Sequence, residues 1–128
     1  MPFNVDVFAT KLRERAHKVG FGNGECAKFV RTALDAGGAD TSGHLVAAKT
    51  YGPVLLKNGF RELSVESPEG FLFMKGYIVD IEPPEHGRQE GHIAGYDGKN
   101  WISDFVQNGF WPGPAYRKER PSYVVYRR

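Results

Sequence analysis

Helical periodicity ends before residue 40 and strand-like patterns begin only after residue 70, and this separation constrains the fold most strongly. Apolar residues recur at spacings of three and four over residues 5–18 and 25–36, which predicts two amphipathic helices. Short runs rich in β-branched and aromatic residues predict strands at 77–82, 91–97, 101–107 and 123–127. Helices followed by strands predict an α+β fold with the N-terminal helices packed on an antiparallel sheet.

Turn residues indicate how these elements connect. Gly37-Gly38 follows the second helical pattern, and Asn23 precedes it as a candidate N-cap. Asp97-Gly98 lies between two strand patterns and predicts a β-hairpin. Residues 39–70 carry no clear periodicity and are compatible with one short helix. Because there is no repeat and no low-complexity linker, we expect residues 1–128 to form one domain.

Composition narrows the classes of protein. The chain has 41% hydrophobic and 25% charged residues and a net charge of +2, which is typical of a globular domain. No apolar run approaches the ~20 residues that span a membrane, and the N-terminus lacks the basic-then-apolar order of a signal peptide. Short basic clusters near the C-terminus indicate a solvated surface. We therefore expect a chain made in the cytoplasm without a signal peptide, with no membrane and no nucleic-acid partner.

The only cysteine, Cys26, lies where a glycine-rich loop meets the second predicted helix. One cysteine excludes an intramolecular disulfide. A helix N-terminus lowers the pKa of a thiol and so favours the nucleophilic thiolate. The alternative is structural, because Cys26 also falls on the apolar face of that helix, and free cysteine is among the most buried residue types.

A thiol nucleophile needs an imidazole base, and the sequence offers four histidines. His17, His44 and His86 fall at a helix end, in an irregular stretch and in a loop. His92 opens a predicted strand, and a rigid element is where a catalytic base is best held.

Asp104 is the candidate for the group that orients the imidazole. Alternation in "WISDFVQ" places its carboxylate between the aliphatic side chains of Ile102 and Val106, and such local conflicts mark functional sites. A hairpin centred on Asp97-Gly98 would make Asp104 a near cross-strand neighbour of His92. Each residue has an ordinary structural explanation by itself; the combination of thiol, imidazole and carboxylate favours catalysis.

The segments that carry these residues resemble a known family. "GNGECAKFVRTAL" and the downstream "GHIAGYDGKNWISDF" resemble the NlpC-like and CHAP amidases, papain-like cysteine peptidases that cut cell-wall peptides. The C-terminal run "SDFVQNGFWPGPAYRKERPSYVVYR" resembles small amidase domains delivered between bacteria by type VI secretion. The resemblance implies a papain-like fold and the catalytic set Cys26, His92 and Asp104.

The resemblance also implies the substrate and the partners. The substrate would be a peptidoglycan stem peptide or cross-link, cut in the periplasm of a target bacterium, and a periplasmic immunity protein would protect the producer. Asn23 and Gly24 in the catalytic loop, with Phe21 and Trp111, are the expected substrate-binding residues. The chemistry requires no cofactor. We also expect no metal, because one cysteine with distant partners lacks the paired spacing of a zinc site.

Two alternatives stay open on the residues alone. A papain-like peptidase, deamidase or acyltransferase could act on an intracellular target. A non-catalytic binding module would keep Cys26 as part of the core.

Overall fold

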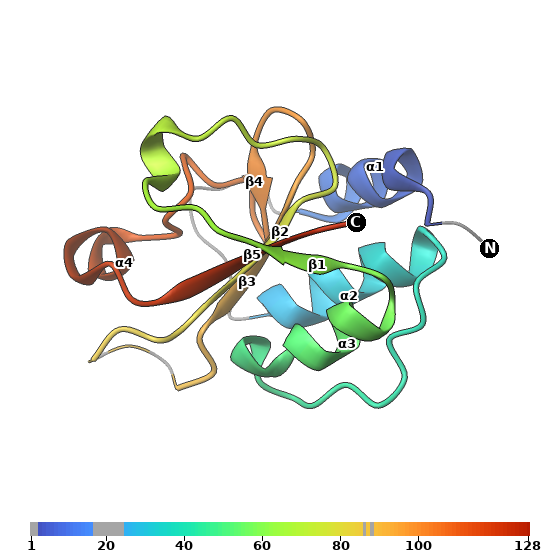
Figure 1. Ribbon diagram of the computed structural model, residues 1–128, viewed down its shortest axis with the longest axis horizontal. Coiled ribbons are helices and arrows are strands. Elements are labelled where there is room, and N and C mark those ends of the chain that lie inside the picture. The colour runs from blue at the N-terminus through green and yellow to red at the C-terminus, as the bar shows by residue number, and fades with distance from the viewer. Residues whose placement is uncertain (1–2, 17–24, 86, 88) are drawn as a thin grey trace.

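A five-stranded antiparallel sheet forms the centre of the protein, with α1, α2 and α3 on one face (Figure 1). The computed structural model describes residues 3–16, 25–85, 87 and 89–128. The helices are α1 (Val5–Arg15), α2 (Cys26–Ala36), α3 (Gly52–Lys57) and α4 (Pro114–Glu119), with 3-10 turns η1 (Ala48–Thr50) and η2 (Pro68–Gly70). The strands are β1 (Arg61–Leu63), β2 (Ile78–Ile81), β3 (His92–Tyr96), β4 (Trp101–Ile102) and β5 (Tyr123–Arg127). The predicted α+β architecture is confirmed.

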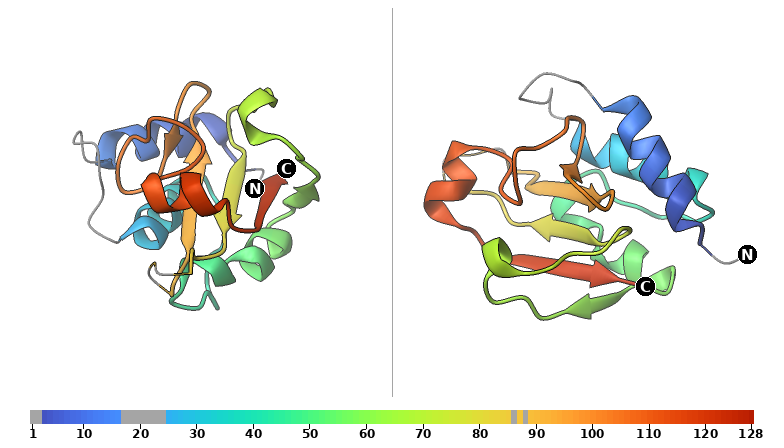
Figure 2. Two further views of the ribbon diagram at one scale, coloured as in Figure 1. Left: turned by 90° about the vertical axis from the view of Figure 1, so that its left-hand side faces the viewer. Right: turned by 90° about the horizontal axis from the view of Figure 1, so that it is seen from above.

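The strand order β1-β5-β2-β3-β4 places β2 at the centre of the sheet. β2 pairs with β3 on one side and with the C-terminal strand β5 on the other. All four residues of β2 are buried, because both faces of the sheet are covered. In the left view of Figure 2, α1 and α2 lie to one side of the strands and the segment that contains η2 lies to the other.

Side chains that alternate along the strands point to opposite faces of the sheet and contribute to two separate apolar clusters. Ile78 and Ile93 face the helices and join residues of α1, α2 and α3 in the first cluster. Val79 and Ala94 face the opposite side and join a cluster dominated by aromatic residues, including Trp101, Phe110 and Trp111. The sheet is therefore the middle layer between a helical and an aromatic layer.

Most of the predicted elements are present, with shifted ends. α1 begins as predicted but ends at Arg15, because Ala16 leaves the helical region with ψ 140°. α2, β2, β3 and β5 match the predicted segments to within a residue at each end. The candidate N-cap Asn23 lies outside the described residues.

Two predictions fail in the second half of the chain. The strand expected over 101–107 ends at Ile102, because the chain turns back on itself immediately afterwards. Neither β1 nor α4 was expected: β1 has only three residues, and α4 has no buried residue to produce an apolar period.

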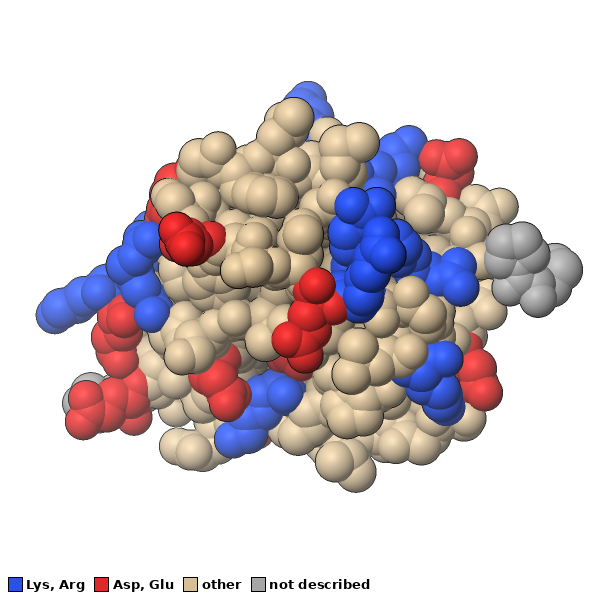
Figure 3. Space-filling model, viewed as in Figure 1, with Lys and Arg blue, Asp and Glu red and all other residues tan. Residues whose placement is uncertain are grey.

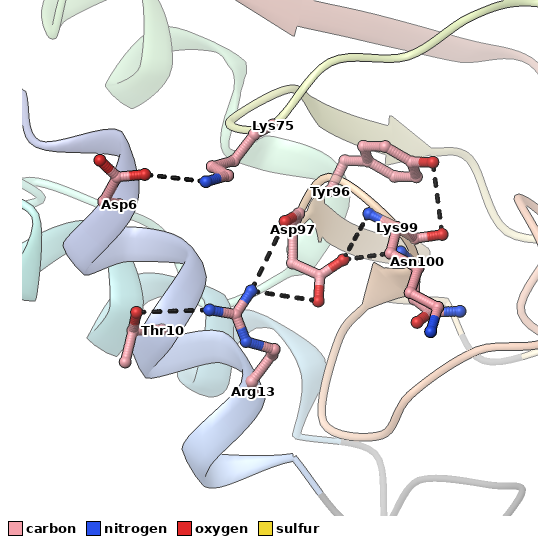
Figure 4. A network of polar contacts seen from close by, with 8 residues as sticks. All are labelled: Asp6, Thr10, Arg13, Lys75, Tyr96, Asp97, Lys99 and Asn100. Carbon is pink, nitrogen blue, oxygen red and sulfur yellow. Dashed lines mark hydrogen bonds and ion pairs between the residues drawn. The ribbon is translucent and has the colours of Figure 1, made fainter.

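The hairpin signal at Asp97-Gly98 is confirmed, and its aspartate also ties the turn to α1 (Figure 4). Asp97 Oδ1 accepts hydrogen bonds from the backbone N–H groups of Lys99, at 2.9 Å, and Asn100, at 2.6 Å. Its Oδ2 lies 3.4 Å from Nη1 of Arg13 on α1. Gly98 adopts φ +101°, which a glycine accommodates without strain.

Gly95 in β3 allows α1 to approach the sheet closely. A Cβ at this position would lie 2.6 Å from Cζ of Phe8 and 2.8 Å from Cδ1 of Leu12. Both side chains are among the most buried in the protein, so neither has room to withdraw.

We predict that Gly95→Ala destabilises the protein by about 1–3 kcal/mol through overpacking between α1 and β3. Urea denaturation followed by circular dichroism measures the free energy of unfolding. Gly113→Ala is the matched control, because a Cβ there meets no atom within 4 Å and φ is extended at −167°. Equal unfolding free energies for the two variants would show that the packing of α1 does not require a glycine at position 95.

Candidate active site

Cys26 is the first residue of α2, and its thiol faces the start of β3. The side chain is 8% exposed. Its sulfur accepts hydrogen bonds from the backbone N–H groups of Ile93 and Ala27. Because Ile93 directly follows His92, the thiol lies beside the backbone of the strand that carries the imidazole. The structure therefore brings the predicted nucleophile and the predicted base to the same end of the sheet.

The start of α2 depends on a carboxylate from elsewhere in the chain. Glu25 occupies the N-cap position, and its own side chain makes no capping hydrogen bond. Oδ2 of Asp104 accepts the Glu25 N–H at 3.1 Å instead. Asp104 is 2% exposed, and a negative charge is favourable at the positive end of a helix.

Gln107 holds the imidazole of His92. Its Oε1 lies 2.8 Å from Nε2 of His92, and both side chains are buried. The amide nitrogen determines the orientation of the Gln107 side chain, because Nε2 donates to the carbonyls of Gly109, at 2.9 Å, and Phe110, at 3.2 Å. The oxygen must then face the ring, so we assign the proton to Nε2 of His92 and leave Nδ1 as the basic nitrogen.

A tight reversal of the chain after β4 positions both Asp104 and Gln107 at the site. The backbone N–H of Ser103 donates to the carbonyl of Phe105 at 3.0 Å, and that of Gln107 donates to the carbonyl of Trp101 at 2.9 Å. Residues 103–107 therefore fold back along β4 instead of extending it. The expectation that Asp104 faces His92 across a regular hairpin is wrong, because strand pairing stops at Ile102.

Asp104 nevertheless lies within electrostatic range of both partners. Its charge raises the pKa of the Cys26 thiol and that of the His92 imidazole, in each case as a smaller effect than burial. The structure thus brings Cys26, His92 and Asp104 together, while the acceptor of the Nε2–H of His92 is Gln107. Sequence reasoning missed Gln107, whose only signal was a polar residue at the end of "WISDFVQ".

Burial has the largest effect on the pKa values of Cys26 and His92. Loss of solvent raises the pKa of Cys26 to about 11, although hydrogen bonds from the Ile93 and Ala27 backbone oppose this rise. Burial lowers the pKa of His92, against the hydrogen bond that the ring donates to Gln107 and the charge of Asp104. Both shifts favour the neutral thiol and the neutral imidazole. The predicted lowering of the thiol pKa by the helix N-terminus is outweighed by desolvation.

A second buried carboxyl, Asp80, lies next to the site on the helical face of the sheet. It pairs in register with Ile93, and its Oδ1 is buried with no hydrogen-bond partner among the described residues. Burial raises the pKa of Asp80 to about 8, so the group is mostly neutral at pH 7. This limits the negative charge that Asp80 places near Cys26.

An aromatic layer covers the other side of the imidazole. The ring of Tyr116 on α4 lies 5.9 Å from the ring of His92. Trp111 is buried, and its indole N–H donates to Oε2 of Glu69 at 3.0 Å. Arg120 stacks over Trp111 and forms an ion pair with Glu69. Trp111 therefore anchors this layer, and it also lines a pocket of about 600 Å³.

The remaining predictions about the site have different outcomes. Phe21, Asn23 and Gly24, expected to bind substrate, lie outside the described residues, as do His17 and His86. Within residues 3–16, 25–85, 87 and 89–128, no three His, Cys, Asp or Glu side chains gather as a metal site would require. No helix in the described part of the chain combines the length and apolar character needed to cross a membrane.

We predict that alkylation of Cys26 in the folded protein accelerates about tenfold per pH unit from pH 6 to 10, because the reactive thiolate stays a minor species below its raised pKa of about 11. Mass spectrometry after timed exposure to iodoacetamide measures the rate. The urea-unfolded chain is the control, and its rate should level off near the ordinary thiol pKa of 9.0. A plateau below pH 7 in the folded protein would instead reveal a thiolate–imidazolium pair.

Comparison with known proteins places this geometry in a family. The chain is similar to a native crystal structure of the type VI effector–immunity complex Tae3–Tai3 from Ralstonia pickettii, with a TM-score of 0.83, 40% identity and 98% of each chain covered. The selenomethionine structure of that complex aligns with a TM-score of 0.79 at 40% identity, covering 94% of this chain and 98% of that one. No family model and no curated protein matches the chain. At this identity and coverage, the chain belongs to the family of the type VI secretion effector Tae3.

Proposed function

We propose that this protein is a papain-like cysteine amidase or endopeptidase that hydrolyses amide bonds in peptidoglycan stem peptides or cross-links. The observation that carries the proposal is the arrangement of the buried site. A thiol at a helix start lies beside the backbone of β3, whose first residue, His92, has its Nε2–H held by Gln107. Nδ1 of His92 is then the nitrogen left to accept the proton of Cys26.

The first half of the reaction forms a thioester. Nδ1 of His92 removes the thiol proton as the sulfur of Cys26 attacks the amide carbonyl carbon. The resulting oxyanion accepts hydrogen bonds from the backbone N–H groups at the start of α2, including that of Cys26. As the C–N bond breaks, Nδ1–H passes its proton to the leaving nitrogen, so the amine departs neutral.

The second half returns the enzyme to its resting state. Nδ1 of His92 removes a proton from water, and the hydroxide attacks the thioester carbonyl. The C–S bond breaks, the carboxylic product leaves, and the sulfur of Cys26 recovers the proton from His92. These steps use only side chains of the chain and water.

We assign different tasks to the two polar residues of the reversal after β4. Gln107 keeps the ring orientation and tautomer of His92 throughout the cycle. Asp104 holds the start of α2 through Glu25 and stabilises the imidazolium that forms in each half-reaction, because its charge favours protonated His92.

The comparisons support the biological setting. The similar structures are complexes of a type VI effector with its immunity protein. We infer that this chain is an antibacterial toxin delivered by type VI secretion to the periplasm of a target cell. We also infer that a periplasmic immunity protein blocks its site in the producing strain.

We predict that the wild-type protein releases new fragments from purified Gram-negative peptidoglycan and that Cys26→Ala releases none, because the variant lacks the nucleophile. Liquid chromatography with mass spectrometry of the digest identifies the bond that is cut. Cys26→Ala should unfold at a similar temperature, which separates lost chemistry from lost structure. Equal digestion by both proteins would refute the thiol mechanism, and no digestion by either would direct the search to intracellular targets.

We predict that Gln107→Ala lowers kcat by roughly 10²-fold, because His92 loses the acceptor that selects its tautomer. Asp104→Asn should have a smaller effect on kcat and should shift the acidic limb of the pH–rate profile to lower pH, since a negative charge that raises the pKa of His92 is removed. Steady-state assays of both variants measure these effects. A larger loss of kcat in Asp104→Asn would identify Asp104 as the orienting residue instead.

A further inference from the structure

A pocket on the aromatic side of the sheet is lined in part by Gln107, the hydrogen-bond partner of His92. It has a volume of about 600 Å³ and lies between η2, the end of β4 and α4. Gln107 forms part of its wall, while Oε1 of the same residue holds Nε2 of His92. A ligand in the pocket would therefore contact the residue that orients the catalytic base.

The floor of the pocket is apolar and rigid. Phe73, Trp101 and Phe110 line it and pack against one another with ring centroids 4.9 to 5.7 Å apart. Trp111 packs edge-on against Phe110 and is pinned by its hydrogen bond to Glu69. Such a surface suits the apolar portion of a ligand without rearrangement of side chains.

The rim of the pocket carries an excess of positive charge. Arg120, Arg117 and Lys99 line it, with Glu69 as its single carboxylate. Both oxygens of Glu69 are already engaged, because Arg120 donates to each of them at 2.6 and 3.0 Å. In the described part of the chain, neither Lys99 nor Arg117 forms an ion pair, and both side chains are exposed.

The two cations flank the pocket from different elements. Lys99 comes from the β3–β4 turn, and Arg117 comes from the first turns of α4. Figure 3 shows basic side chains gathered over α4. Two cations without an internal partner, on either side of an apolar floor, match a ligand that has carboxylates attached to an apolar frame.

We propose that this pocket is the substrate subsite for a carboxylate-bearing segment of the peptidoglycan stem peptide, with Lys99 and Arg117 as its anion-binding residues. The proposal rests on the proposed function, because stem peptides supply free carboxylates next to the scissile amides. It adds to the proposed function the path of the bound substrate, which extends from Cys26 and His92 past Gln107 toward α4.

The test separates binding from chemistry. Cys26→Ala is the parent protein, and its affinity for insoluble peptidoglycan is measured by co-sedimentation. Adding Lys99→Gln and Arg117→Gln should weaken the affinity about three- to tenfold, as expected for two exposed charge contacts. The matched control adds Arg61→Gln and Lys118→Gln, which remove the same charge from exposed positions that do not line the pocket. Its affinity should change less than twofold.

In the active enzyme, the pocket variant should show a raised KM with kcat within twofold of wild type, because Lys99 and Arg117 bind substrate away from the reacting atoms. Affinities of the pocket and control variants that fall equally would overturn the proposal, and so would a parent protein that does not sediment with peptidoglycan. Failure of the proposed function has a different signature. If the wild-type protein cuts nothing while the pocket variant still binds peptidoglycan more weakly, the result would support the subsite and refute the proposed amidase activity.

Discussion

The contact between the start of α2 and the start of β3 positions everything that the site needs. α2 has no capping side chain of its own at Glu25, so its first turn is held by the carboxylate of Asp104. The same turn presents Cys26 to the backbone of Ile93, one residue after His92. The positions of the thiol, the imidazole and the helix terminus therefore depend on the same contact. A change in the reversal after β4, which carries Asp104, would disturb all three together.

Burial of both sheet faces explains why the site can have two separately built halves. The helical layer supplies the nucleophile through α2, and its close approach depends on the small residue Gly95 beneath α1. The aromatic layer supplies Gln107, whose amide is oriented by carbonyls of the segment that carries Phe110. His92 lies at the end of the strand between the layers, where one ring nitrogen can serve each half. Such an arrangement places the reacting atoms at the junction of two rigid cores.

Periodicity and residue chemistry were sufficient to predict most of the architecture and to select Cys26 and His92, which the structure places at the same end of the sheet. Helical spacing located α1 and α2, and β-rich runs located β2, β3 and β5. Cys26 and His92 could be identified because each opens a regular element. The role of Gln107 could not, because its position follows from two backbone hydrogen bonds that reverse the chain after Ile102. No side-chain period encodes such a reversal, and the alternation that drew attention to Asp104 assumed a strand that ends two residues earlier.

The raised pKa of Cys26 determines when its thiol becomes reactive. A thiol with a pKa of about 11 exposes very little thiolate at neutral pH, and thiolate is the form that oxidants and alkylating agents attack. In the proposed mechanism, the proton moves to His92 when the sulfur attacks an acceptor carbonyl and negative charge develops on an oxyanion at the start of α2. The charge of Asp104 then favours the imidazolium that this transfer creates. In the proposed mechanism, burial thus keeps the thiol protonated until a bound substrate makes proton transfer favourable.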